Sequence, residues 1–298
     1  MVAVRGGPLA EGFVVALAAG ACYETSYALQ ALEARRMEAR LALRASLLAQ
    51  LARRRRWLGA TALGVIGFGF QIAALTLAPL TLVQPTLALG LLLLLFLGVR
   101  VLGESVGARE VIAVAAIVLG VTGIALASPD RVESLPPGRD LALVAGCLAA
   151  IAAAPFAFRE RGGRRGLALV LSAGAADAWA AFAAKLTSDE LAAGRPFAAA
   201  AWAASAGAAV LLGLTSEMTA LQRLPATRVA PIVVVMQIVI PVLLAPLVIG
   251  EDWGATPLGG ALLGVALATV AVGAGFLGAS SAVGDLLAGG HSSSGDAS

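Results

Sequence analysis

Apolar stretches long enough to cross a membrane recur along the whole chain, and short polar or proline-containing breaks separate them. About twenty apolar helical residues are needed to cross ~30 Å of hydrocarbon. The chain therefore predicts nine membrane-spanning helices, at residues 11–32, 57–77, 80–100, 109–128, 139–158, 166–186, 197–220, 228–249 and 256–278. We expect an all-α polytopic membrane protein.

The segment 33–56 departs from this pattern. Its apolar run, residues 41–52, is too short to span a bilayer, and Arg44 interrupts it. Four apolar residues share one helical face, and arginines flank them: Met37, Leu41, Leu48 and Leu51. This arrangement is typical of a basic amphipathic helix that lies on the membrane surface.

Composition agrees with a membrane protein and excludes several kinds of chemistry. The chain is 59% hydrophobic and only 13% charged, whereas soluble proteins carry about 25% charged residues. The only histidine, His291, lies in a polar tail, and the two cysteines, Cys22 and Cys147, lie in apolar segments. We therefore expect no disulfide framework, no histidine-based metal or hydrolytic centre, no cofactor, no nucleic-acid partner and no enzymatic activity.

Basic residues predict the orientation of the spans in the membrane. If the N-terminus is outside, sixteen of the 21 lysines and arginines fall on the inner side and five on the outer side. Inner loops of membrane proteins are enriched in lysine and arginine. We therefore expect a multi-pass protein of the cell (inner) membrane with its N-terminus outside and its C-terminus in the cytoplasm.

An internal repeat relates the two halves of the chain. The phrase PLTLVQP at 79–85 recurs as PATRVAP at 225–231, and six of fifteen positions are identical in the surrounding alignment. The repeat pairs spans 1–4 with spans 6–9, and each partner lies five spans later, so partners cross the membrane in opposite senses. This predicts an inverted-topology repeat, which is typical of transporters that alternate access to a midplane site.

The repeat also divides the chain into segments. The expected segments are a first repeat at 1–128, a connector with span 5 at 129–165, a second repeat at 166–278 and a disordered tail at 279–298.

Three stretches carry a resemblance to a known family. They are the junction ALTLAPLTLVQP, the Gly-Glu of VLGESVGARE that closes the third span, and the glycine-rich helix VIAVAAIVLGVTGIALA. Together they resemble the EamA-like drug/metabolite transporter superfamily over roughly residues 11–278. The long basic loop after span 1 and the count of nine spans are similar to its NIPA-like magnesium-transporter branch. The resemblance implies secondary transport of small solutes, or of magnesium in that branch.

Apart from acids at the first two positions of a span, three carboxylates lie within predicted spans: Glu24, Asp177 and Glu217. An acid in a membrane interior costs about 3 kcal/mol on insertion scales, so it is normally paired, water-facing or functional. The repeat places Glu24 opposite Asp177 and Glu217 opposite Gln71. Carboxylates could coordinate a metal ion such as Mg²⁺, pair with an organic cation or carry a coupling proton. For Glu217 an ion pair with Arg223 or Arg228 is the rival interpretation.

Other polar residues and prolines complete the predicted pathway. Tyr27 lies one helical turn after Glu24 and could hydrogen-bond its carboxylate or shield a cation. Thr81 and Thr227 occupy the repeated motif, and either pathway contact or helix capping would explain them. Pro85 and Pro231 lie deeper and are predicted to break their helices, which would free carbonyl groups toward a cavity. For Glu104, at a span end, capping is favoured over transport.

These residues favour a secondary transporter of a small solute, with Mg²⁺ or another cation as one candidate and a small organic metabolite as the alternative. A membrane scaffold that transports nothing is the third possibility. The expected partners are the lipid bilayer and the transported solute or cation, and the oligomeric state stays open.

Overall fold

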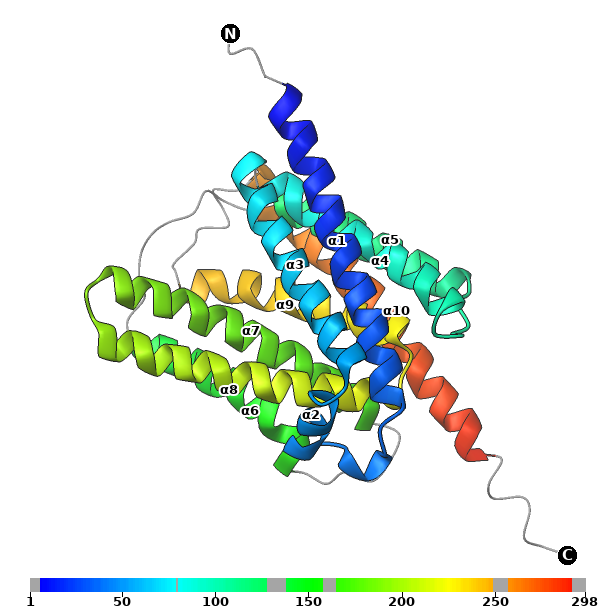
Figure 1. Ribbon diagram of the computed structural model, residues 1–298. Coiled ribbons are helices and arrows are strands. Elements are labelled where there is room, and N and C mark those ends of the chain that lie inside the picture. The colour runs from blue at the N-terminus through cyan, green and yellow to red at the C-terminus, as the bar shows by residue number, and fades with distance from the viewer. Residues whose placement is uncertain (1–5, 79, 128–137, 158–164, 249–256, 291–298) are drawn as a thin grey trace, which may run out of the picture.

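The computed structural model describes residues 6–78, 80–127, 138–157, 165–248 and 257–290, and within these ranges the chain is helical (Figure 1). Six of the described helices are long and apolar enough to cross a membrane. Three shorter apolar stretches, Leu143–Ala157, Gly166–Ala180 and Ala226–Gln237, lie where further spans are predicted. The chain is therefore a helical multi-pass membrane protein, and the count of nine spans stays a prediction.

The helices fall close to the predicted spans. In chain order they are α1 (Gly6–Arg35), α2 (Ala45–Leu51), α3 (Arg55–Leu77), α4 (Leu80–Arg100), α5 (Ala108–Ala127), α6 (Gly138–Ala157), α7 (Arg165–Ala192), α8 (Pro196–Leu221), α9 (Ala226–Val248) and α10 (Ala261–Gly290). Two short 3₁₀ helices, η1 (Ala39–Leu41) and η3 (Pro257–Gly260), precede α2 and α10.

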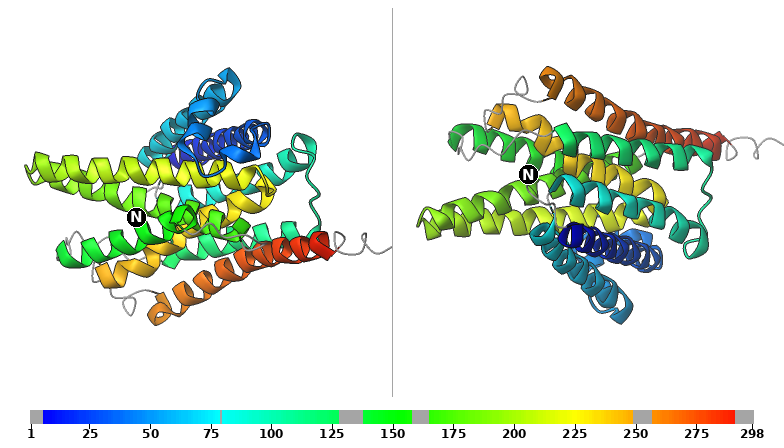
Figure 2. Two further views of the ribbon diagram at one scale, coloured as in Figure 1. Left: turned by 90° about the horizontal axis from the view of Figure 1, so that it is seen from below. Right: turned by 90° about the horizontal axis from the view of Figure 1, so that it is seen from above.

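The helices pack as two groups that share a common core. Helix α1 lies against α3 and α4, whereas α7 lies against α8, α9 and α6. Helix α10 packs along α5 and also contacts α9, so it joins the two groups (Figure 2). One large apolar cluster contains Leu91 of α4, Ile117 of α5, Met218 of α8 and Leu263 of α10.

The outward faces of several helices carry large apolar side chains, as a membrane protein requires. A soluble protein rarely exposes apolar patches of this extent. The most exposed of them include Val65, Ile66 and Phe68 on α3, Leu119 and Leu126 on α5, Val210 and Leu211 on α8, and Val265 and Val272 on α10.

The inner prolines do not break their helices, contrary to the prediction. Pro85 is the sixth residue of α4 and Pro231 the sixth of α9, and both helices continue past them. So near a helix start, proline removes only one backbone hydrogen bond. The Thr86 hydroxyl, next to Pro85, donates to the Leu82 carbonyl at 2.7 Å and adds a local bond to the first turns of α4.

The segment 33–56 is not the single amphipathic helix that its sequence predicts. Helix α1 continues to Arg35, and η1 and the seven-residue α2 follow. Leu41, Leu47 and Leu51 are buried in the protein core, so the apolar face packs on protein.

Residues 279–290 of the expected disordered tail are helical. Helix α10 runs to Gly290, because residues 279–288 contain mostly helix-compatible alanine, leucine, serine and valine before two glycines end the pattern. Residues 291–298 of the predicted tail lie outside the described residues.

Glycines let α5 and α10 approach each other at backbone distance. A Cβ atom on Gly120 would lie 2.9 Å from the Ala266 carbonyl oxygen and 2.9 Å from the Val270 nitrogen. A Cβ atom on Gly273 would lie 2.8 Å from the Ala113 carbonyl oxygen. Small residues at such crossings drive helix association in lipid, where the hydrophobic effect contributes little.

The α5–α10 contact predicts an unequal effect of two glycine substitutions. Gly120→Ala would force the backbones apart and is expected to destabilise the fold by about 1–3 kcal/mol. Gly275→Ala, on the same helix pair, is the control, because nothing lies within 4 Å of its Cβ position. Thermal melting of both variants in one detergent checks this, and equal melting temperatures would contradict the close packing.

Candidate functional site

Glu24 lies in the middle of α1, where it is buried at the contact with α4. Gly90 of α4 faces it, and a Cβ atom there would lie 3.1 Å from the Glu24 Cγ and 3.2 Å from the Gly20 carbonyl oxygen. Glycine at position 90 therefore permits α4 to pass close to α1 beside the acid. Any larger residue would press on the Glu24 side chain.

Asp177 occupies a comparable position on α7. Gly213 of α8 faces it, and a Cβ atom at that glycine would lie 3.1 Å from the Asp177 Oδ1. Each acid therefore lies against a glycine of a neighbouring helix, which is α4 for Glu24 and α8 for Asp177.

Tyr27 and Glu217 connect the two acids. Helix α1 contacts α8, and the Tyr27 hydroxyl lies within electrostatic reach of Glu217, Glu24 and Asp177. Glu217 in turn interacts electrostatically with Asp177 and with Glu24. We call Glu24, Tyr27, Asp177 and Glu217 the carboxylate cluster.

The Tyr27 hydroxyl is buried and lies beside the Glu217 carboxylate, with which it interacts.

Gln71 joins the site through Tyr23, which is not among the predicted pathway residues. The Tyr23 hydroxyl on α1 donates to the Gln71 Oε1 on α3 at 2.6 Å. Tyr23 directly precedes Glu24, so this bond fixes α1 against α3 beside the carboxylate cluster. The CYETSY motif, with a tyrosine on either side of the acid, is the signal that could have pointed to it.

No basic residue neutralises the carboxylate cluster within the described part of the chain. Arg228, the expected rival partner of Glu217, pairs with Glu110 at 3.4 Å, and Arg223 is exposed. The described residues contain no group of three acidic, cysteine or histidine side chains close enough to hold a metal ion. The cluster therefore brings three carboxyl groups together, and the described residues supply neither a counterion nor a ready-made metal cage.

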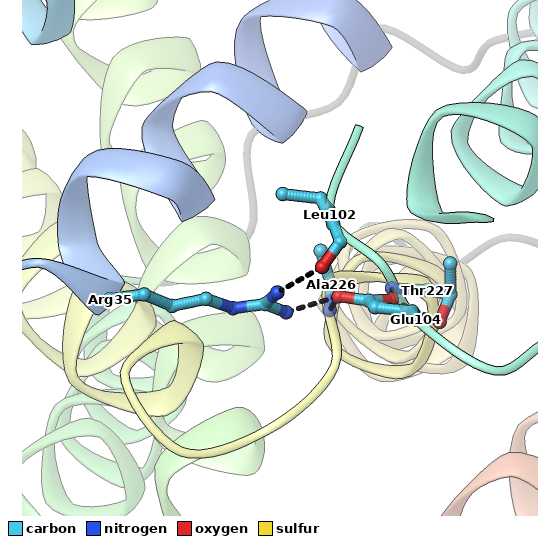
Figure 3. A network of polar contacts seen from close by, with 5 residues as sticks. All are labelled: Arg35, Leu102, Glu104, Ala226 and Thr227. Atoms are coloured by element: carbon cyan, nitrogen blue, oxygen red, sulfur yellow. Dashed lines mark hydrogen bonds and ion pairs between the residues drawn. The ribbon is translucent and has the colours of Figure 1, made fainter. Parts of the chain in front are cut away.

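Thr227 lies elsewhere, in a polar network at the start of α9 that we call the Glu104 network (Figure 3). Glu104 follows α4, and its carboxylate accepts hydrogen bonds from the Ala226 N–H at 2.7 Å, the Thr227 N–H at 3.0 Å and the Thr227 hydroxyl at 2.5 Å. Acidic groups at a helix N-terminus satisfy its free N–H groups and favour its dipole. Capping is the role expected of Glu104, but the capped helix belongs to the other half of the chain.

Arg35, at the end of α1, completes the Glu104 network. Its guanidinium forms an ion pair with Glu104 and donates to the Leu102 carbonyl at 3.3 Å (Figure 3). The Glu104 side chain is only 5% exposed, so this pair is well shielded from water. Three segments that are distant in sequence, the end of α1, the α4–α5 connection and the start of α9, therefore meet at one carboxylate.

Glu33, near the same end of α1, is a second buried acid with ion-pair partners. It pairs with Arg36 at 2.8 Å and with Arg54 at 3.0 Å, which ties α1 to the start of α3. The Thr81 side chain, also predicted to line the pathway, lies outside the described residues.

No family model, curated protein or solved structure matches this chain. The likeness to the drug/metabolite transporters therefore rests on the sequence motifs alone. The carboxylate cluster and the Glu104 network are the features from which a function can be inferred.

The Glu104 network predicts a large effect of one exchange and a small effect of a matched one. Glu104→Ala removes the cap of α9 and leaves Arg35 without its partner, so we expect a loss of about 2–3 kcal/mol in stability. Glu38→Ala removes an acid whose side chain is 60% exposed and pairs only with Arg40, so a change below about 0.5 kcal/mol is expected. Melting temperatures in detergent check the difference, and similar losses for both would refute the network's role.

Proposed function

We propose that the chain is a secondary membrane transporter that moves a small cationic solute by alternating access. The observation that carries the proposal is the carboxylate cluster, in which acids from α1, α7 and α8 interact without a basic partner among the described residues. Uncompensated acids inside a membrane are costly and commonly mark an ion or substrate pathway.

The charge of the carboxylate cluster favours a cation as the solute. Hydrated Mg²⁺ is the first candidate, because Mg²⁺ keeps several of its waters and can be held by carboxylates through them. Such binding does not require three acids at direct ligand distance, which the described residues do not provide. The half-buried Tyr27 ring favours an organic cation as the second candidate, because aromatic faces attract organic ammonium groups.

Matching contacts in the two groups of helices support an inverted repeat of spans 1–4 and 6–9. Helix α1 packs on α3 and α4 in the way that α7 packs on α8 and α9. Across the α5–α10 contact, Gly120 faces Ala266 and Val270, while Gly273 faces Ala113 and Ile117. Gly120 and Gly273 are 153 residues apart, as are Ala113 and Ala266, and Ile117 and Val270. The same spacing separates Glu24 from Asp177.

The middle helices of the two groups match in the same way. Gly67 of α3 faces Cys22 and Tyr23 of α1, and Gly213 of α8 faces Ala176 and Asp177 of α7. The two glycines are 146 residues apart, which is the spacing of the repeated proline motif. A pseudo-twofold relation of this kind supports nine spans with termini on opposite sides of the membrane. The cytoplasmic C-terminus of the proposed transporter rests on the distribution of basic residues, and its membership of the EamA-like superfamily rests on the sequence motifs.

In this transporter the Glu104 network would close the pathway on its cytoplasmic side, and we call this role the inner closure. With the N-terminus outside, the ends of α1 and α4 and the start of α9 all lie on the cytoplasmic side. The network joins the two repeats there, so the conformation described here would be closed to the cytoplasm. Opening toward the cytoplasm would separate Glu104 from α9 or from Arg35.

Uptake by reconstituted protein tests the proposed function. Proteoliposomes that enclose a fluorescent Mg²⁺ indicator should report influx with wild-type protein. Glu24→Gln, Asp177→Asn and Glu217→Gln should each lower the rate at least about tenfold, which corresponds to about 1.4 kcal/mol. Glu11→Gln, an exposed acid on the same helix as Glu24, is the matched control and should transport normally.

The outcomes separate the candidate functions. Normal uptake by all three cluster variants would refute the site. Absence of Mg²⁺ uptake, together with stabilisation of the wild type by an organic amine in a thermal-shift screen, would assign the solute to the organic class. Absence of any transported or stabilising solute would favour the scaffold.

A reversible cross-link tests the inner closure directly. The Cβ position of Gly98 lies 3.7 Å from the Thr227 Cβ, within the range of disulfides. In a background with Cys22 and Cys147 replaced by serine, oxidised Gly98→Cys/Thr227→Cys protein should lose most of its uptake. Reduction should restore it.

A second cysteine pair controls for the cross-link itself. The Cβ position of Gly64 on α3 lies 3.7 Å from the Ser26 Cβ on α1, within one proposed repeat. Oxidised Ser26→Cys/Gly64→Cys protein should keep its uptake, because these helices would move as a unit. Full activity of the oxidised Gly98/Thr227 pair would contradict the closure.

A further inference from the structure

A basic cavity lies away from the carboxylate cluster, where η1 and the segment that joins it to α2 meet the ends of α6 and α8. Helix α2 contacts α8 and lies below it in Figure 1. The cavity has a volume of about 450 Å³, and three arginines line it, Arg40, Arg44 and Arg223. Pro155 and Phe156 of α6 contribute apolar walls.

The positive charge of this cavity is largely uncompensated. Arg40 pairs with the exposed Glu38, whereas Arg44 and Arg223 have no ion pair within the described part of the chain. Arg223 follows the C-terminus of α8, where a basic residue also offsets the helix dipole. That explanation does not extend to Arg44, which lies on a separate segment and faces the same cavity.

The segment that carries two of the arginines is held over α8 by a specific backbone contact. The Leu43 N–H donates to the Thr219 hydroxyl oxygen at 3.0 Å. Leu43 has a φ of 57°, in the left-handed region that branched residues rarely adopt. Such strain persists only where the surroundings maintain it, and it is frequent at binding sites.

The cavity lies at the boundary of the apolar helices. The apolar stretch of α6 ends at Ala157 and that of α8 at Leu221, directly beside the lining residues Phe156 and Arg223. A ligand here would meet arginines on one side and the edge of the hydrocarbon on the other. Basic pockets between membrane helices bind the phosphate groups of anionic lipids.

We propose that Arg40, Arg44 and Arg223 bind a phosphate group in this cavity, and that the phosphate belongs to the headgroup of an anionic phospholipid. Arginine binds phosphate oxygens through paired N–H donors. Phe156 and Leu43 would contact the glycerol and the upper acyl chains. The site is independent of the proposed transport function, because it shares no residue with the carboxylate cluster.

Binding measurements on delipidated full-length protein test the site. Native mass spectrometry would follow the addition of phosphatidylglycerol or phosphatidylcholine, and thermal shifts would follow inorganic phosphate. The wild type should retain phosphatidylglycerol and not phosphatidylcholine. A basic residue near an anionic surface contributes about fivefold in affinity, so Arg40→Gln/Arg44→Gln/Arg223→Gln should bind phosphatidylglycerol roughly 100-fold more weakly.

A matched variant distinguishes lipid binding in the cavity from non-specific attraction between arginines and an anionic lipid. Arg53→Gln/Arg55→Gln/Arg56→Gln removes the same charge from exposed residues around the start of α3 that do not line the cavity. It should keep phosphatidylglycerol binding. The single exchange Arg44→Gln changes an exposed residue and should weaken phosphatidylglycerol binding about fivefold. It keeps the test valid if the triple variant does not fold.

Each outcome decides the proposal. Equal loss of lipid in the cavity variant and the matched variant would overturn the site, as would wild-type binding of neither phosphatidylglycerol nor phosphate. Stabilisation by inorganic phosphate that the cavity variant lacks, without lipid binding, would retain the phosphate site and overturn the lipid as its source.

Discussion

The burial of three carboxylates in an apolar helical protein is the constraint on which the arrangement of this molecule depends. Glu24, Asp177 and Glu217 interact with each other, and no described basic residue compensates them. Acids held in this way repel one another and lose hydration, so the fold must contain opposing contributions. The close helix contacts around them supply those contributions.

Glycine makes these contacts possible at the acids themselves. Gly90 allows α4 to pass beside Glu24, and Gly213 allows α8 to pass beside Asp177. Dispersion and interhelical hydrogen bonds, such as the bond from Tyr23 to Gln71, then stabilise the pairs of helices in lipid. The Tyr27 hydroxyl remains inside this framework, beside the Glu217 carboxylate.

The sequence alone could predict the helices better than it could predict their contacts. Apolar length follows from bilayer thickness, so α3, α4 and α5 begin and end near their predicted bounds. Local rules failed where packing overrides them: Pro85 is accommodated within α4, and Leu47 and Leu51 are buried against protein. The repeat could relate Glu24 to Asp177 because it carries long-range information. Nothing comparable connects Arg35 with Glu104, since that pair has no counterpart among the described residues.

The continuity of α1 links the carboxylate cluster to the Glu104 network. Glu24 and Arg35 lie on one uninterrupted helix, eleven residues apart, which is about 16 Å along its axis. Arg35 binds the carboxylate that caps α9, and Glu24 faces the acids of α7 and α8. In the proposed transporter, a cation that drew the acids together would change the position of α1 relative to α8, and a rigid helix would carry that displacement to Arg35. Coupling between solute binding and the Glu104 network would then require no element beyond α1, because α1 contacts both regions.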